Sequence, residues 1–189
     1  RWFVLSDSPP DRDIFWSESG VEAAGKFIKK IWNTILHLND LSKKKETNIN
    51  SASQDLKAGN HKTLSKVSND LDSLSFNKVI ASLYSYVGDI SKIKEEDCIN
   101  SEILEETIYF LIIMLNPITP HMAEEAWRLT QKTKTLLCDE AWPKYDKDLV
   151  KESEVLIPIQ INGKKRSEII VTVGLGASEI EKIVLQQPK

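Results

Sequence analysis

The sequence has 189 residues, a formal net charge of −3, 41% hydrophobic residues and 28% charged residues. These values are typical of a soluble globular protein of one domain, or one domain and a small second one, whose core needs no disulfide or metal. The acidic balance argues against a dedicated nucleic-acid-binding protein, which is usually strongly basic, but it does not exclude a basic face.

Cysteine spacing and hydropathy exclude further classes of protein. Cys98 and Cys138 lie far apart and outside any CxxC or Cys/His spacing, which argues against a zinc site or a disulfide scaffold and predicts free thiols in a reducing cytosol. No apolar run approaches the roughly 20 residues that span a bilayer, and the first residues lack the basic and apolar regions of a signal peptide. We therefore expect a cytoplasmic protein without a membrane partner.

A lead-in segment and a long first helix are predicted at the N-terminal side. Pro9 and Pro10 oppose a helix within residues 1–16. The spacing Ser19-x-x-Glu22 is that of a capping box and predicts a helix that runs to about residue 40. Its apolar residues recur every three or four positions and form one face: Val21, Ala24, Ile28, Ile31, Ile35 and Leu38, widened by Phe27 and Trp32.

Two helices are predicted after a polar, aperiodic loop at 42–53. The second helix carries Leu64, Val67, Leu71 and Leu74 on its buried side. Ser75 is predicted to cap the third helix, and Gly88 indicates a close crossing with another helix because it has no side chain. The apolar face of the third helix consists of Phe76, Val79, Ile80, Leu83, Val87 and Ile90.

A fourth and a fifth helix follow a charged connector at 92–100. The fourth helix is apolar on nearly every side toward its end, which is typical of the central helix of a bundle. Pro117 ends it, whereas Thr119 and Pro120 suit the N-cap and first position of a fifth helix at about 120–131. The apolar residues of the fourth helix are Ile103, Leu104, Ile108, Leu111, Ile112 and Leu115.

The pattern changes after Trp142-Pro143. Alternating apolar residues at 155–161, the hairpin-turn pair Asn162-Gly163 and an apolar run at 166–173 predict two antiparallel strands. Ser178 then opens a short helix. The chain is therefore predicted to end in a ββα unit.

Catalytic and metal-binding patterns are absent from the sequence. The three histidines match no metal-ligand spacing, no glycine-rich phosphate loop precedes a helix, and no Ser/His/Asp set stands out. Basic residues gather in three places, where they are either solubility charges or contacts to RNA phosphates. They are Lys26, Lys29 and Lys30 on the first helix, His61, Lys62 and Lys66 on the second, and Lys164, Lys165 and Arg166 after the hairpin turn.

Five segments, in order, resemble bacterial leucyl-tRNA synthetases. They are SPPDRDIFWSESGVEAAGKFI at 8–28, HKT at 61–63 with FN at 76–77, NPITPHMAEEAW at 116–127, Trp142-Pro143 with Asp146, and IQINGKKR at 159–166. The resemblance implies a mainly α fold, the class I synthetase anticodon-binding helical bundle of about five helices followed by the small ββα unit. It implies a stem-contact segment at 1–16, the bundle at 17–150 and the start of a C-terminal α/β domain at 151–189.

The resemblance also implies a function. The parent enzymes attach leucine to tRNA-Leu with ATP and Mg, and their HIGH and KMSKS motifs and editing domain would lie upstream of this chain. We therefore expect an inactive fragment with no catalytic, cofactor or metal site, which holds tRNA-Leu by its backbone and shape. Its expected partners are tRNA-Leu and the rest of the synthetase chain, and we expect a monomer. Trp16, Trp32 and Trp127 are predicted to pack in the core rather than stack on bases.

Two alternatives stay open at this point. One is the same domain of a valyl- or isoleucyl-tRNA synthetase, which would share the bundle architecture. The other is a helical module that binds only proteins, and its binding would be insensitive to salt.

Overall fold

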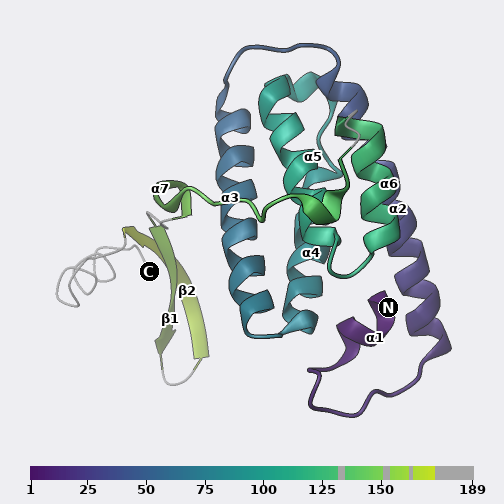
Figure 1. Ribbon diagram of the computed structural model, residues 1–189. Helices are drawn as coiled ribbons and strands as arrows, with labels where there is room; N and C mark the ends of the chain where they lie inside the picture. The colour runs from purple at the N-terminus through teal and green to yellow at the C-terminus, as the bar shows by residue number, and fades with distance from the viewer. Residues whose placement is uncertain (132–134, 151–153, 162–163, 173–189) are drawn as a thin grey trace. The chain divides into compact units, whose positions relative to one another are not determined.

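The computed structural model describes residues 1–131, 135–150, 154–161 and 164–172, and the chain divides into two units, 1–146 and 147–189 (Figure 1). The first unit is helical. Its elements are α1 (Trp2–Asp7), α2 (Glu18–Ser42), α3 (Ser51–Asp72), α4 (Phe76–Ile90), the 3-10 turn η1 (Glu95–Asp97), α5 (Ser101–Leu115), α6 (Pro120–Gln131) and the 3-10 turn η2 (Leu137–Asp139).

Helix α5 is the centre of the first unit. It packs against α2, α3 and α6, and its last turns are buried on all sides, with Leu111, Ile112, Met114 and Leu115 each 0% exposed. Burying one such side chain contributes about 1.5–3 kcal/mol. The prediction of a central fourth helix is confirmed, and so are the ends of α6 at Pro120 and Gln131.

The predicted first helix exists as α2, but its cap is wrong by two residues. The N-cap is Ser17, whose Oγ accepts the N–H of Gly20 at 3.1 Å. Ser19 lies inside the first turn instead. A Cβ added to Gly20 would come within 2.6 Å of the Phe3 ring, so the ring would have to shift if this residue had a side chain.

Helix α1 is missing from the prediction. Trp2, which is 2% exposed, packs against Phe27 and Tyr84 with ring centroids 5.4 and 5.8 Å away, and its Nε1 donates to the Tyr84 hydroxyl at 3.2 Å. A helix this short is not stable alone, so it depends on these contacts. Pro9 and Pro10 follow its end at Asp7 and do not prevent it.

Three smaller expectations for α3 and α4 are also wrong. Helix α3 begins inside the predicted loop, because the Asn50 side chain accepts the N–H of Ser53 at 2.8 Å and caps it. Leu74 is 60% exposed with a φ of 53°, so it turns the chain between the helices and is not part of the core. No described atom lies within 4 Å of a Cβ placed on Gly88, which excludes a close crossing there.

A buried chain of hydrogen bonds joins α4, α3 and α5. The Tyr86 hydroxyl donates to Asn60 Oδ1 at 2.7 Å, Asn60 Nδ2 donates to Thr107 Oγ1 at 2.9 Å, and Thr107 Oγ1 donates to the Ile103 carbonyl at 2.7 Å. Burial, together with the charge of Glu106, raises the pKa of the Tyr86 phenol, so that it stays protonated and donates. Asn60 on α3 therefore connects Tyr86 on α4 to Thr107 on α5.

The second unit contains α7 (Lys147–Val150), β1 (Glu154–Ile161) and β2 (Lys164–Thr172). The strands pair antiparallel, which confirms the predicted hairpin. Ile159 is opposite Ser167 and Gln160 is opposite Lys165, so the register shifts between them and Arg166 is the extra residue of a bulge in β2. Helix α7 was not predicted. The Asn162-Gly163 turn and the helix expected from Ser178 lie outside the described residues.

We expect Asn60→Ala to lower the free energy of unfolding by about 2–4 kcal/mol, because it leaves the Tyr86 hydroxyl and Thr107 Oγ1 buried with one partner fewer. Denaturant unfolding followed by circular dichroism would measure it. Asn69→Ala, at an exposed position of the same helix, is the matched control and should stay within about 0.5 kcal/mol. Equal effects of the two substitutions would contradict the role of the buried chain.

Candidate nucleic-acid interface

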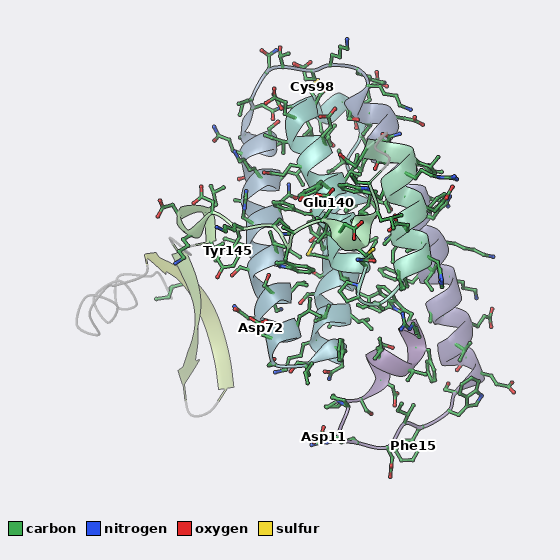
Figure 2. The ribbon with its side chains drawn as sticks, in the orientation of Figure 1. Asp11, Phe15, Asp72, Cys98, Glu140 and Tyr145 are labelled. Atoms are coloured by element: carbon green, nitrogen blue, oxygen red, sulfur yellow. The ribbon has the colours of Figure 1, made fainter. Side chains whose placement is uncertain are left out.

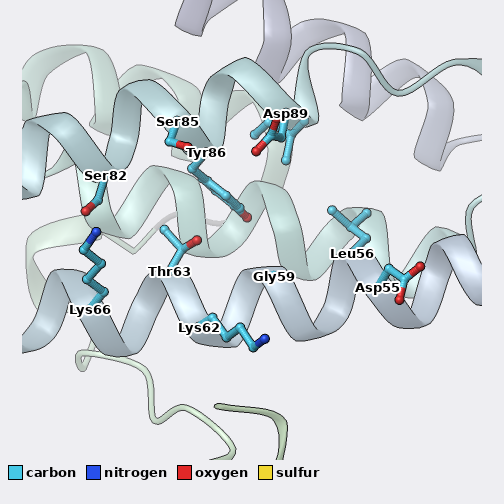
Figure 3. Close-up of a pocket in the computed structure, with 11 residues that line it drawn as sticks. Asp55, Leu56, Gly59, Lys62, Thr63, Lys66, Ser82, Ser85, Tyr86 and Asp89 are labelled. Carbon is cyan, nitrogen blue, oxygen red and sulfur yellow. The ribbon is translucent and has the colours of Figure 1, made fainter. Parts of the chain in front are cut away.

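Two lysine-bearing hollows lie on either side of α4, which packs against both α2 and α3. The α2 hollow, of about 410 Å³, is lined by Lys26, Lys29, Lys30, Asn33, Thr34, His37 and Ser91. The α3–α4 groove, of about 360 Å³, carries Lys62 and Lys66 and extends to Asp89 and Ile90 at the end of α4 (Figure 3). Cations thus lie on both α2 and α3, and the α2 hollow reaches α4 at Ser91, the residue after its end.

The α2 hollow is placed by the face of α2 that points away from the core. Lys26, Lys29 and Lys30 are exposed, whereas the apolar residues between them are wholly or partly buried. Lys26 is paired with Glu22 at 2.7 Å, one helical turn earlier. No ion pair among the described residues involves Lys29 or Lys30, so their charges are available to a ligand.

In the α3–α4 groove, Lys62 and Lys66 are one helical turn apart on α3 and both are exposed. Like Lys29 and Lys30, they take part in no ion pair among the described residues. The structure therefore places two pairs of uncompensated cations on rigid helices, with α4 between them.

His61 is wrong as a surface candidate, because it is only 6% exposed. Its Nδ1 accepts the backbone N–H of Asp146 at 3.1 Å, its Nε2 lies 3.5 Å from Glu106 Oε1, and its ring meets Phe110 edge-on. Since Nδ1 accepts, the neutral ring carries its proton on Nε2, which faces the carboxylate. His61 is a structural residue of the bundle.

The bond to Asp146 belongs to a strap, residues 140–146, that crosses α3 (Figure 1). Trp142 Nε1 donates to Ser68 Oγ at 2.8 Å, and Tyr145 packs against the core beside α3 (Figure 2). His61 and Ser68 on α3 are both far in the sequence from the strap residues that they bind. Spacing alone therefore contained no signal for this contact.

The three tryptophans predicted to pack in the core differ in burial. Trp127 is 5% exposed and donates to the Thr135 carbonyl at 3.1 Å, and Trp32 is partly buried against the core, so core packing is right for both. Trp16 contradicts the prediction, because it is 72% exposed and touches only Phe3 among the aromatic residues described. Phe15 beside it is 81% exposed, on the segment between α1 and α2 (Figure 2).

The third basic group lies in the second unit. Lys164 is opposite Ile161, Lys165 is opposite Gln160, and Arg166 is at the shift of register. These three residues stay candidates, and their strand positions are all that the structure adds.

Among the described residues, no group of three or more His, Cys, Asp or Glu side chains could hold a metal ion. In that same part of the chain, no helix is long and apolar enough to cross a membrane.

Residues 53–181 match the model of the family described as the anticodon-binding domain of tRNA ligases. The chain belongs to this family. Its relatives include the leucine–tRNA ligase of Bartonella bacilliformis, 37% identical over 191 residues, which cover 98% of this chain and 22% of the relative. The leucine–tRNA ligase of Sinorhizobium medicae is 37% identical over 194 residues, with the same shares of 98% and 22%. The chain thus spans about a fifth of the length of these curated relatives.

A solved structure shows the same fold. The Agrobacterium radiobacter LeuRS, determined as a ternary complex with tRNA and LeuAMS, superposes with a TM-score of 0.77 over 100% of this chain and 24% of that one, at 23% identity. The family and the helical anticodon-binding fold predicted from the sequence are confirmed. The chain corresponds to the anticodon-binding part of its leucine–tRNA ligase relatives.

We expect His61→Ala to lower the free energy of unfolding by about 2–3 kcal/mol, because the Asp146 N–H loses its acceptor and Glu106 loses its neighbour in a buried setting. His121→Ala, at an exposed position on α6, is the control and should change stability by less than about 0.5 kcal/mol. Urea unfolding of both variants measures this. A neutral His61→Ala would show that the strap does not depend on the imidazole.

Proposed function

We propose that this chain is the tRNA-binding part of a leucine–tRNA ligase and that it holds tRNA-Leu by its phosphate backbone. The observation that carries the proposal is the set of four uncompensated lysines, Lys29, Lys30, Lys62 and Lys66, along the two sides of α4. Cations on rigid helices neutralise phosphates and position an RNA without reading its bases. The leucine–tRNA ligase relatives favour leucine over valine or isoleucine.

Charge distribution supports an RNA contact on this side despite the net charge of −3. The acidic residues Glu95, Glu96 and Asp97 form η1, and Glu102 is in the first turn of α5. Lys44 pairs with Glu95 and Lys94 with Glu96, so these two lysines near that end are compensated. Lys29, Lys30, Lys62 and Lys66, by contrast, have no ion-pair partner among the described residues.

The activity of a full-length ligase would lie in other parts of the enzyme. There, ATP and Mg would serve leucine activation and transfer to tRNA, and we propose no cofactor for this chain. We further propose that the enzyme acts as a cytoplasmic monomer and that tRNA-Leu is its cognate RNA. The coarser statement, membership of a tRNA-ligase family, is what these proposals rest on.

We expect the chain to bind a tRNA-Leu transcript with an affinity that falls steeply with salt. Four phosphate contacts predict a slope of log K against log salt of about −3. Fluorescence anisotropy across a salt series, with a second tRNA that has a short variable arm, measures both the slope and the preference. A slope near zero would favour the alternative of a protein-only module, and absence of binding at low salt would contradict the proposal.

We expect the quadruple variant Lys29→Ala, Lys30→Ala, Lys62→Ala and Lys66→Ala to weaken tRNA binding at least about tenfold and to flatten the salt slope, because it removes four counterion-releasing contacts. Thermal unfolding should change little, since all four side chains are exposed. The charge-matched control is Lys43→Ala, Lys44→Ala, Lys92→Ala and Lys94→Ala, which removes only exposed ion pairs. Equal losses in both variants would mean that net charge, and not these two surfaces, controls binding.

A further inference from the structure

The α3–α4 groove differs from the α2 hollow in having a buried hydroxyl without a hydrogen-bond partner among the described residues. In the α2 hollow, the Thr34 hydroxyl donates to the Lys30 carbonyl and the Ser91 hydroxyl to the Gly88 carbonyl. Ser82 and Ser85 of α4 and Lys62 and Lys66 of α3 line the α3–α4 groove, and Lys66 extends toward α4 whereas Lys62 extends away from it (Figure 3). Figure 3 shows the Ser82 hydroxyl and the Lys66 ammonium pointing toward one another at one end of the groove. This end therefore carries both kinds of donor that bind a phosphate oxygen, a cation and a neutral O–H.

Ser82 provides an observation that is independent of the lysines. Its side chain lines the groove and is only 7% exposed, yet its Oγ has no hydrogen-bond partner among the described residues. A serine within a helix can donate to the carbonyl three or four residues earlier, as Ser42 and Ser68 do. A buried hydroxyl without a partner destabilises the free protein. Because buried hydroxyls without a partner are rare, Ser82 is a candidate donor to a ligand at this end of the groove.

The opposite end of the groove is acidic. Asp89 is paired with Lys92 at 3.0 Å, whereas Asp55 is in no ion pair among the described residues. A carboxylate can only accept hydrogen bonds, so this end repels a second phosphate and suits a hydroxyl donor. Nucleic-acid bases have N–H donors in RNA and DNA alike, whereas the ribose 2′-hydroxyl is the hydroxyl donor that is present in RNA and absent from DNA.

We propose that the α3–α4 groove is a site for one strand of RNA, with a backbone phosphate at Lys66 and Ser82, the charge of Lys62 at the border of the groove, and a ribose 2′-hydroxyl of the same strand at Asp55. The site deepens the proposed function and rests on it. It separates the two lysine surfaces beside α4 by role: in the α2 hollow the hydroxyls already donate to backbone carbonyls, whereas the α3–α4 groove offers charge with an unpartnered hydroxyl and an acceptor.

The first test is Ser82→Ala in the full 189-residue chain. We expect tRNA affinity to fall three- to tenfold, while the melting temperature stays equal or rises, because an unpartnered buried hydroxyl is removed. Ser51→Ala, at an exposed position on α3 outside the groove, is the control and should leave affinity unchanged. A lower melting temperature with unchanged affinity would make Ser82 structural and overturn the site.

The second test separates the lysines of the groove from general charge. We expect Lys62→Ala with Lys66→Ala to weaken tRNA binding about tenfold, and the charge-matched pair Lys57→Ala with Lys78→Ala, at exposed positions outside the groove, to have a clearly smaller effect. Equal losses in the two pairs would overturn the assignment of a phosphate to this groove.

The third test concerns the ribose. We expect the chain to bind a single-stranded RNA more tightly than the DNA of the same sequence, and Asp55→Ala to remove that preference. Asp55→Ala removes a negative charge and so strengthens binding to RNA and DNA alike. The ratio of the RNA affinity to the DNA affinity is not changed by this general effect. A ratio that is unchanged in the variant would overturn the 2′-hydroxyl contact.

The remaining outcomes distinguish the site from the function. If the parent chain binds tRNA and neither Ser82→Ala nor the Lys62/Lys66 pair weakens it, the groove is overturned and the proposed function stands. If the parent chain does not bind tRNA, both fail. Inorganic phosphate provides a separate arm: amide NMR shifts at Lys66 and Ser82 that Ser82→Ala abolishes, without any change in tRNA affinity, would assign the groove to a free anion and overturn the RNA site.

Discussion

The first unit depends on the burial of α5 on all its sides. A helix that is apolar around its whole circumference cannot face water, so it must be surrounded. Helices α2, α3 and α6 cover it, and each contributes its own apolar face. This arrangement leaves α4 in a second position, packed on α3 and touching α2. The exposed side of α4, where the lysines gather, is therefore a consequence of how the neighbours of α5 are arranged.

The polar residues in the interior make this arrangement specific. Apolar faces alone allow helices to slide or rotate past one another, whereas buried hydrogen bonds require matched partners. Asn60 on α3 binds both Tyr86 on α4 and Thr107 on α5, so the three helices have a defined register. That register brings Ser82 and Lys66 to the same end of the α3–α4 groove. The candidate RNA site is thus linked to the core through α3 and α4.

One side of α3 serves structure and another serves binding. His61 and Lys62 are neighbours in the sequence, but the histidine is buried beneath the strap and the lysine is exposed in the groove. The strap leads from the bundle to the second unit and is held to α3 by His61 and Ser68. The two roles are compatible because a helix turns by about 100° per residue, so adjacent side chains point in different directions.

By itself, the sequence determined the local features of this protein. The spacing of apolar residues predicted α2 to α5, the capping residues Thr119 and Pro120 predicted α6, and the family resemblance identified the anticodon-binding fold. These features depend on neighbouring residues, which the sequence shows directly. Lys29, Lys30, Lys62 and Lys66 were also found in this way, because exposed lysines on an amphipathic helix follow from its period.

Only the tertiary structure decided which distant residues meet. Helix α1 forms because Trp2 packs against Phe27 and Tyr84. The packing of α3 against α4 places Ser82 and Lys66 in the same groove. The sequence predicts His61 as a surface cation, but in the structure the backbone N–H of Asp146, far along the chain, donates to its Nδ1. The reason is physical: periodicity tells which side of a helix is buried, but the partner of a given side chain is set by the packing of whole helices against one another.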